Sequence, residues 1–290
     1  MIRKIEFAVE GNTVCGNLHL PSSDAPYPAV VTGGPMTSVK EQVTGTYAAA
    51  LAEHGIAALA IDHRHYGESG GMPRQYEYYP HKIEDLRAAI EALAGQHEVD
   101  DTRIGAVGVC LGSGYLAHAV QDNAHVKAFA AIAGYYRDVP AMRAADPEGF
   151  NEKVAEGVAA REHYEATGEV TVIPAVALDR DAAMTLQSTY DYYADRAVHP
   201  NYVNEFALMS REHFLQFDVQ SAAPEVGVPF LMIHGPNALN PAWAEKFFEA
   251  IPGTKERHVI QSKGQTDIYD DPSIVSLAAD YAADFLKRHL

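Results

Sequence analysis

The chain has 290 residues, and its 39 acidic and 22 basic side chains give a formal net charge of −17. This negative charge argues against nucleic acid and anionic membrane as partners, because both need an electropositive surface. The composition is 47% hydrophobic and 21% charged, which is ordinary for a globular protein and excludes disorder as the dominant state. Neither a signal sequence nor a run of 18 apolar residues occurs, so we expect a cytoplasmic protein without a membrane span.

The two cysteines, Cys15 and Cys110, lie far apart and belong to no spaced set. This spacing argues against a disulfide framework and against a cysteine-based zinc site. The chain also has no G-x-G-x-x-G turn and no H-E-x-x-H pair. We therefore expect no metal and no organic cofactor, and we expect a small-molecule substrate as the partner. The sequence leaves the oligomeric state open, a homodimer included.

Short β-rich runs alternate with helical patterns along most of the chain. Runs such as IAALAID are continuously apolar, which is typical of parallel strands that helices cover on both faces. We expect strands at 3–11, 13–21, 28–34, 56–62, 103–109, 127–134, 228–235 and 256–261, and helices at 39–54, 81–95, 110–120, 241–251 and 272–289. This order predicts an α/β fold with a mostly parallel, doubly wound sheet.

The alternation breaks in the middle of the chain, where the sequence becomes mostly helical in character and rich in tyrosine. Because the sheet pattern resumes afterwards, we interpret this stretch as an insertion into one sheet rather than as a separate domain. We predict a core formed by residues 1–134 and 227–290 and a helical cap formed by residues 135–226.

The strongest chemical signal is the motif G-x-C-x-G around Cys110, at the junction of a strand and a helix. A nucleophile on such a strained turn needs small neighbours, which Gly108 and Gly112 supply. The backbone N–H of Leu111 can donate to a developing oxyanion, and the helix terminus favours the thiolate. The alternative interpretation is a buried cysteine before a tight packing turn.

With these motifs the chain resembles the α/β-hydrolase superfamily, particularly its dienelactone-hydrolase-like branch, where cysteine often replaces serine at the elbow. The resemblance covers essentially the whole chain, with the landmarks GNLHLP, GGPMTSVKEQ, IDHRHYGESGGMPR, KIEDLRAAIEAL, VDDTRIGAVGVCLGSGY and GQTDIYDDP. It implies an α/β-hydrolase fold and a second oxyanion donor in the loop after the third strand, at the N–H of Met36. Many relatives carry His-Pro where this chain has Gly34 and Pro35, a change that opens space above Cys110.

The same resemblance implies an acid after PFLMIHG and a histidine base in the loop after the last strand, and neither is present. The first acidic residue after PFLMIHG is Glu245, inside the next helix, and Gln265 occupies the position expected for the base. Gln265 can orient a carbonyl or a water but takes no proton at neutral pH. Asp267 is a candidate acid or base, with turn capping as its alternative. The sequence therefore predicts a degenerate triad.

Three histidines are candidates to replace the base. His234 ends a central strand at the expected active edge, although a structural histidine before a turn has the same signature. His63 and His65 follow the fourth strand and face the same edge, either lining the pocket or bonding the loop backbone.

Tyrosines around the cap are the candidate pocket wall, because tyrosine offers a flat apolar face with a polar tip. We expect Tyr66, Tyr135 and Tyr136 near an aromatic or polyketide-like substrate, with cap packing as the alternative. Three functions stay open: Cys110-dependent chemistry on an ester, lactone or thioester; a non-hydrolytic cyclase, isomerase or lyase of secondary metabolism; and a catalytically silent binding protein.

Overall fold

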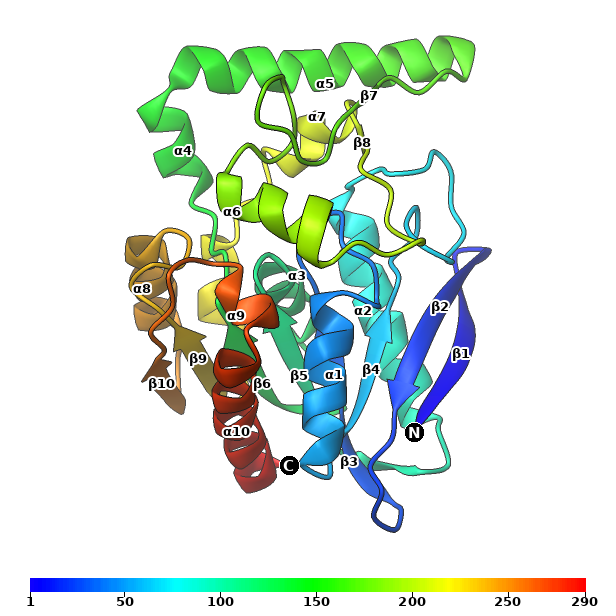
Figure 1. The fold of residues 1–290 in the computed structure, drawn as a ribbon, viewed down its shortest axis with the longest axis vertical. Coiled ribbons are helices and arrows are strands. Elements are labelled where there is room, and N and C mark those ends of the chain that lie inside the picture. Colours follow the sequence, from blue (N-terminus) through cyan, green and yellow to red (C-terminus); the bar gives the residue numbers. More distant parts are fainter.

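A single eight-stranded sheet forms the centre of the molecule, which the computed structural model describes over residues 1–290 (Figure 1). In spatial order its strands are β1 (Ile2–Val9), β2 (Asn12–His19), β4 (Ala57–Ile61), β3 (Tyr27–Gly33), β5 (Val99–Val109), β6 (Val126–Ile132), β9 (Phe230–His234) and β10 (Lys255–Val259). Only β2 runs antiparallel to its neighbours, and all other pairs are parallel. The predicted mostly parallel α/β sheet is confirmed.

The burial of the strands explains why their sequences are so apolar. Every residue of β4 and β9 is buried, whereas β1 alternates between exposed and half-buried residues at the edge of the sheet. A strand covered on both faces needs apolar side chains at every position, and an edge strand needs them only at alternate positions.

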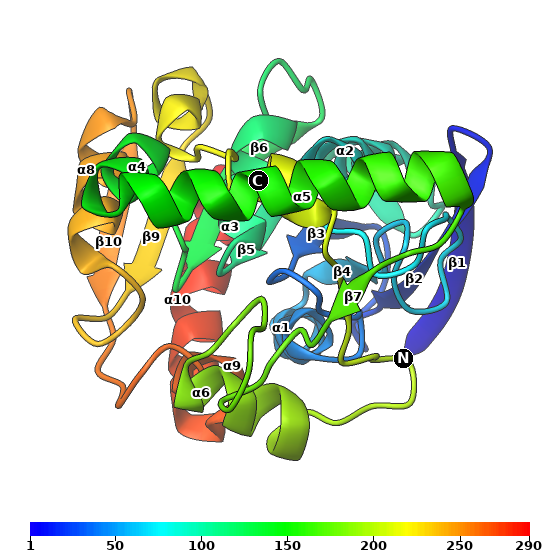
Figure 2. The same ribbon diagram turned by 90° about the horizontal axis from the view of Figure 1, so that it is seen from above.

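Helices cover both faces of this sheet (Figures 1 and 2). Helices α1 (Val43–Glu53) and α10 (Pro272–His289) pack on one face, and α2 (Tyr79–Ala94), α3 (Gly112–Ala119) and α8 (Pro241–Ala250) pack on the other. None of the helices combines the length and the apolar character that a bilayer span requires.

The first helix begins four residues later than the sequence pattern predicts. Residues 39–42 form a turn instead, in which the Lys40 N–H donates to the Asp62 carboxylate at 2.8 Å and the Val39 N–H donates to the Gln42 side chain at 3.1 Å. These side-chain acceptors satisfy backbone donors that a helix start would leave free, so the chain turns here before α1 begins.

The helical cap lies between β6 and β9, above the carboxyl ends of the strands. It contains α4 (Val139–Ala145), α5 (Pro147–Thr167), β7 (Val172–Ile173), α6 (Gln187–Tyr190), a π-helical turn (Asp191–Arg196), β8 (Phe206–Ala207), α7 (Ser210–Phe214) and a 3₁₀ turn (Gln220–Glu225). Helix α5 crosses over the whole molecule (Figure 2) and ends at Gly168, whose φ of +76° favours glycine. After it, the cap is less helical than expected, because loops and the short strand β7 occupy residues 168–186, and β7 pairs with β8 later in the cap.

Candidate active site

Cys110 occupies a sharp turn between β5 and α3 and has a φ of +56°, in the left-handed region. The turn is tight because a Cβ on Gly108 would lie 2.5 Å from Ser113 Cα, and a Cβ on Gly112 would lie 2.2 Å from the Gly33 carbonyl oxygen. Glycine is therefore required on both sides of Cys110 for steric reasons. The turn has the strand–elbow–helix geometry that the G-x-C-x-G motif predicts.

Three polar groups surround the Cys110 sulfur: the Tyr269 hydroxyl, the Leu111 N–H and the Gln265 side-chain amide. No histidine and no carboxylate is among these neighbours. Burial raises the pKa of the Cys110 thiol above its usual value, although these three groups act in the opposite direction. The sequence predicts that the helix terminus favours the thiolate, but the cost of burying a charged sulfur is larger and favours the thiol.

The Gln265 side chain is held in one orientation by contacts on both of its ends. Its oxygen accepts the Leu239 N–H at 3.0 Å, and its nitrogen donates to the Ala133 carbonyl at 2.7 Å and to the Tyr269 hydroxyl at 3.1 Å. Both amide hydrogens are therefore engaged, one of them on the Tyr269 hydroxyl beside the sulfur, and the amide cannot accept a proton.

The two expected oxyanion donors lie at the same cavity. Met36 and Leu111 both line it, and neither backbone N–H donates to an oxygen of the chain. The loop that carries Met36 is fixed at the next residue, where the Thr37 N–H donates to the buried Glu77 carboxylate at 3.0 Å. An oxyanion hole needs such free and rigidly held donors.

The cavity above Cys110 has a volume of about 270 Å³ and an apolar lining drawn from the core and the cap. Its lining residues are Pro35, Met36, Cys110, Leu111, Tyr135, Arg137, Met142, Ala183, Met184, Thr185, Leu186, Thr189, Tyr193, Phe214, Leu215, Leu239 and Tyr269. Of the substrate-binding candidates, Pro35 and Tyr135 are among them, whereas Gly34 packs against Ser38 and Thr44 instead.

The candidate acid and base residues lie away from the cavity. The Asp267 carboxylate accepts the N–H groups of Lys263 and Gly264, at 2.8 and 2.9 Å, as a turn cap does. His234 is buried between two carbonyl oxygens, those of Gly235 at 3.1 Å and Gly134 at 3.2 Å. Burial lowers the pKa of His234, which keeps its ring neutral.

The remaining histidine and tyrosine candidates also belong to structural networks. His63 Nδ1 lies 3.3 Å from Asp85, and His65 bonds the Pro73 carbonyl and His81. The Tyr66 hydroxyl donates to Glu77 at 2.7 Å, and Tyr136 stacks on Phe247 with ring centroids 4.3 Å apart. None of these four candidates lines the cavity.

Among the residues of the site that the sequence did not indicate are Tyr269, Leu239 and Arg137. Tyr269 lies in the segment Asp267–Asp270 that the sequence singles out, four residues after Gln265, so one helical turn brings the two side chains together. Leu239 stands four residues after Gly235, where the resemblance implies the acid. Arg137 carries no motif signal.

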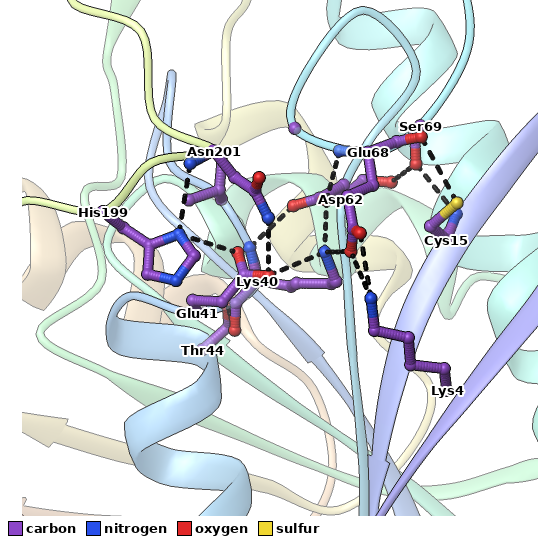
Figure 3. A network of polar contacts seen from close by, with 12 residues as sticks. Lys4, Cys15, Lys40, Glu41, Thr44, Asp62, Glu68, Ser69, His199 and Asn201 are labelled. Carbon is purple, nitrogen blue, oxygen red and sulfur yellow. Dashed lines mark hydrogen bonds and ion pairs between the residues drawn. The ribbon is translucent and has the colours of Figure 1, made fainter.

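An acidic cluster of Glu41, Asp62 and Glu68 has the composition of a cation site (Figure 3). The ammonium of Lys40 lies between them, 2.8 Å from Glu41 and 2.7 Å from each of the other two carboxylates. Glu41 also accepts a hydrogen bond from Asn201 of the cap at 3.0 Å. The cluster is therefore a partly buried ion-pair network, centred on the buried Lys40 and Asp62, that ties the cap to the core.

The fold agrees with that of the proteins to which the chain is similar. A family described as serine aminopeptidase, S33, matches residues 40–264. The chain belongs to this family. Protein PA2218 of Pseudomonas aeruginosa is 30% identical over 306 residues, which cover 99% of this chain and 81% of that protein. The PA2218 crystal structure superimposes with a TM-score of 0.85 and covers 100% of this chain and 94% of its own.

Other relatives of this S33-family chain bear names of hydrolases. The alpha/beta hydrolase GrgF from Penicillium sp. sh18 superimposes with a TM-score of 0.81 at 23% identity, over 100% of this chain and 99% of its own, and so shares the fold. Thiohydrolase aneE of Aspergillus aculeatus is 40% identical over 108 residues, which are 37% of this chain and 33% of that protein. The S33 chain therefore has the α/β-hydrolase fold and belongs to a group of hydrolases. The family is named for serine, whereas this member has Cys110 at the elbow.

Proposed function

We propose that the protein is an acyl-transfer enzyme in which Cys110 attacks the carbonyl of a thioester, with esters and lactones as poorer substrates. The observation that carries this proposal is the set of groups around the sulfur: three neutral hydrogen-bonding groups, no histidine and no carboxylate. Such a site can stabilise negative charge on sulfur and on a carbonyl oxygen, but it supplies no strong general base.

The reaction balances without a histidine. The Cys110 sulfur forms a bond to the carbonyl carbon, and the carbonyl electron pair moves to the oxygen, which the N–H groups of Leu111 and Met36 hold. Collapse of this intermediate breaks the bond to the substrate sulfur, which leaves as a thiolate. The proton of the Cys110 thiol reaches that thiolate through the Tyr269 hydroxyl, so the products are an acyl-Cys110 thioester and a free thiol.

The leaving group is the reason to prefer thioesters. A thiolate leaves readily because its conjugate acid has a pKa near 8.5, whereas an alkoxide needs a proton from a general acid. Exchange of one thioester for another is also close to balanced in energy. The partial relationship to a thiohydrolase supports the same substrate class.

Release of the acyl group favours a nucleophile carried by the substrate over water. No base near Cys110 can activate water, and the cavity lining is mainly apolar. A hydroxyl or a carbon nucleophile held in the same cavity profits from proximity and needs less activation. A cyclase that releases a lactone or ring is therefore the second candidate function.

Acyl transfer to Cys110 is tested with N-acetylcysteamine thioesters and the matching ethyl esters. We expect intact-protein mass spectrometry to show one acyl adduct from the thioester, located on Cys110 by peptide mapping, and little adduct from the ester. Cys110→Ala should abolish the adduct, and Cys15→Ala is the matched control that should keep it. Full thioester turnover by Cys110→Ala would contradict covalent catalysis.

The fate of the acyl group separates hydrolase from cyclase. With an ω-hydroxyacyl thioester, a cyclase releases mainly the lactone and a hydrolase releases mainly the hydroxy acid. A wild-type enzyme that releases only the acid at a rate above 1 s⁻¹, roughly the lower end of ordinary enzyme turnover, would contradict the second candidate.

A further inference from the structure

Arg137 is the only charged residue in the lining of the cavity above Cys110. It lies at the start of the cap, five residues after the end of β6, and its side chain is 1% exposed. Burial of a guanidinium costs several kcal/mol unless an anion compensates it, so a buried arginine is normally paired with a carboxylate.

No such carboxylate accompanies Arg137, since it takes part in no ion pair within 4.0 Å. The two acidic residues that act on the charge of Arg137, Asp218 and Glu77, have other hydrogen-bond or ion-pair partners. Asp218 accepts the Val139 and Ser221 N–H groups at 2.9 and 3.0 Å, and Glu77 is paired with Lys82 at 2.7 Å. The positive charge of Arg137 is therefore uncompensated within the chain.

The hydrogen-bonding capacity of Arg137 is also largely unused. Its Nη2 donates to the Leu215 carbonyl at 3.1 Å, its Nε is buried without an acceptor, and its Nη1 donates to no protein atom. The Phe214 ring covers one face of the guanidinium, with the central carbon 4.3 Å from the ring centroid. Stacking occupies the face and leaves the N–H edge available for a planar anion.

We propose that Arg137 is an anion subsite that binds a carboxylate on the acyl part of the substrate while the reacting carbonyl lies at Cys110. This inference rests on the proposed acyl transfer, because that reaction is what places the reacting carbonyl of the same substrate at Cys110. A carboxylate matches the flat fork of the guanidinium, and pairing in this mainly apolar cavity supplies the countercharge that the chain lacks.

The cavity also limits the size and polarity of the spacer that joins the carboxylate to the reacting carbonyl. Apart from Arg137, its lining consists mainly of apolar side chains such as Met142 and Leu186, and its volume of about 270 Å³ is small. The substrate class is therefore a thioester of a short dicarboxylic acid, with an apolar spacer and one free carboxylate.

The subsite is tested without relying on turnover, by alkylation of Cys110 with matched charged and neutral probes. The probes are 3-maleimidopropionate, 6-maleimidohexanoate and the methyl ester of each acid. Peptide mass spectrometry separates labelling of Cys110 from labelling of Cys15. For at least one spacer length we expect the acid to half-saturate labelling at a concentration at least 10-fold below that of its methyl ester.

Arg137→Met should reduce this acid-to-ester ratio to near one, and Arg137→Lys should retain part of it. Arg143→Met is the matched control, because Arg143 is an exposed arginine of the same cap and its replacement changes the net charge equally. We expect Arg137→Met to unfold no earlier than wild type, since it removes an unpaired buried charge. This melting comparison shows whether a lost preference reflects a lost fold.

The outcomes distinguish the subsite from the reaction. An acid preference that is absent in the wild type, or that persists in Arg137→Met, would overturn the subsite. If the preference is present and depends on Arg137 but no thioester acylates Cys110, the subsite stands and the proposed function fails. If neutral thioesters acylate Cys110 and no probe shows an acid preference, the reaction stands and the subsite fails.

Discussion

The amide of Gln265 stands beside the Cys110 sulfur at the position where the resemblance implies a histidine. Its oxygen faces a backbone donor, the Leu239 N–H, so its nitrogen must face the carbonyl of Ala133 and the Tyr269 hydroxyl. A histidine in the same place would meet the same Leu239 N–H. That donor would bond to Nδ1 and leave the proton on Nε2, the tautomer that cannot act as a base.

This geometry predicts that Gln265→His alone does not create a hydrolase. A carboxylate at the Leu239 position is needed to select the other tautomer, and a wrong tautomer costs about 10⁴-fold in a serine protease triad. We expect the double variant Gln265→His with Leu239→Asp to release acyl-Cys110 by hydrolysis at least 100-fold faster than either single variant. Single-turnover deacylation, followed by mass spectrometry, measures this rate.

The matched control for that double variant is Gln265→Asn with Leu239→Asp, which introduces the acid without a base. It should deacylate no faster than wild type. A Gln265→His single variant that equals the double variant would show that the Leu239 N–H does not set the tautomer.

At the scale of secondary-structure elements, the elbow depends on how closely β5, α3 and β3 approach one another. A methyl group on Gly112 would lie 2.2 Å from the Gly33 oxygen and 2.6 Å from the Gly34 nitrogen, both backbone atoms that cannot yield cheaply. We expect Gly112→Ala to lower the free energy of unfolding by about 3 kcal/mol or to prevent folding.

Gly95→Ala is the control for this substitution, because the nearest atom to its Cβ is 3.7 Å away and its φ is −76°. Urea unfolding should show little change in that variant. A Gly112→Ala protein as stable as Gly95→Ala would mean that β3 and α3 are not packed as described.

The loop with the second oxyanion donor is connected to α2, α3 and the cap through one buried residue, Glu77. Glu77 accepts the Thr37 N–H at 3.0 Å and the Tyr115 hydroxyl at 2.6 Å, pairs with Lys82, and donates its own N–H to Ser210 at 2.9 Å. These contacts bring the site together from elements that are distant in sequence.

Glu77→Gln should therefore destabilise the protein by roughly 3–5 kcal/mol, because it leaves the Lys82 ammonium buried and unpaired. The double variant Glu77→Gln with Lys82→Met should recover much of this loss. Urea unfolding of the two single variants and the double variant measures the coupling. The pairing argument would be contradicted if the double variant lost more stability than the two single variants lose in sum.

At the scale of the whole molecule, the sequence was sufficient for the sheet, its covering helices and the elbow. Those features follow from local patterns, such as the continuous apolar runs of β4 and β9 and the glycines beside Cys110. The lining of the cavity was not predictable to the same extent, because its residues come from core and cap segments that only tertiary packing brings together. Arg137 shows this, since its significance lies in the absence of a partner, which no sequence pattern reports.

Buried neutral histidines make the stability of the whole molecule depend on pH. His65 donates from Nδ1 to the Pro73 carbonyl at 2.9 Å, so its Nε2 must accept from His81 Nδ1, at 2.8 Å. Burial and the neighbouring His81 lower the pKa of His65 to about 4. The unfolded chain therefore takes up a proton below pH 6.5 that the folded protein refuses until about pH 4.

Stability from this group is fully present above pH 6.5 and is lost as the pH falls toward 4. One such proton lowers the free energy of unfolding by roughly 2 kcal/mol between pH 7 and pH 5. We expect His65→Gln to reduce the loss of stability over this interval by about that amount, measured by urea unfolding at both pH values. His97→Gln, at an exposed histidine whose side chain is 81% accessible, should leave the loss unchanged. An unchanged pH dependence in His65→Gln would show that His65 is not kept neutral by its burial and its bond to His81.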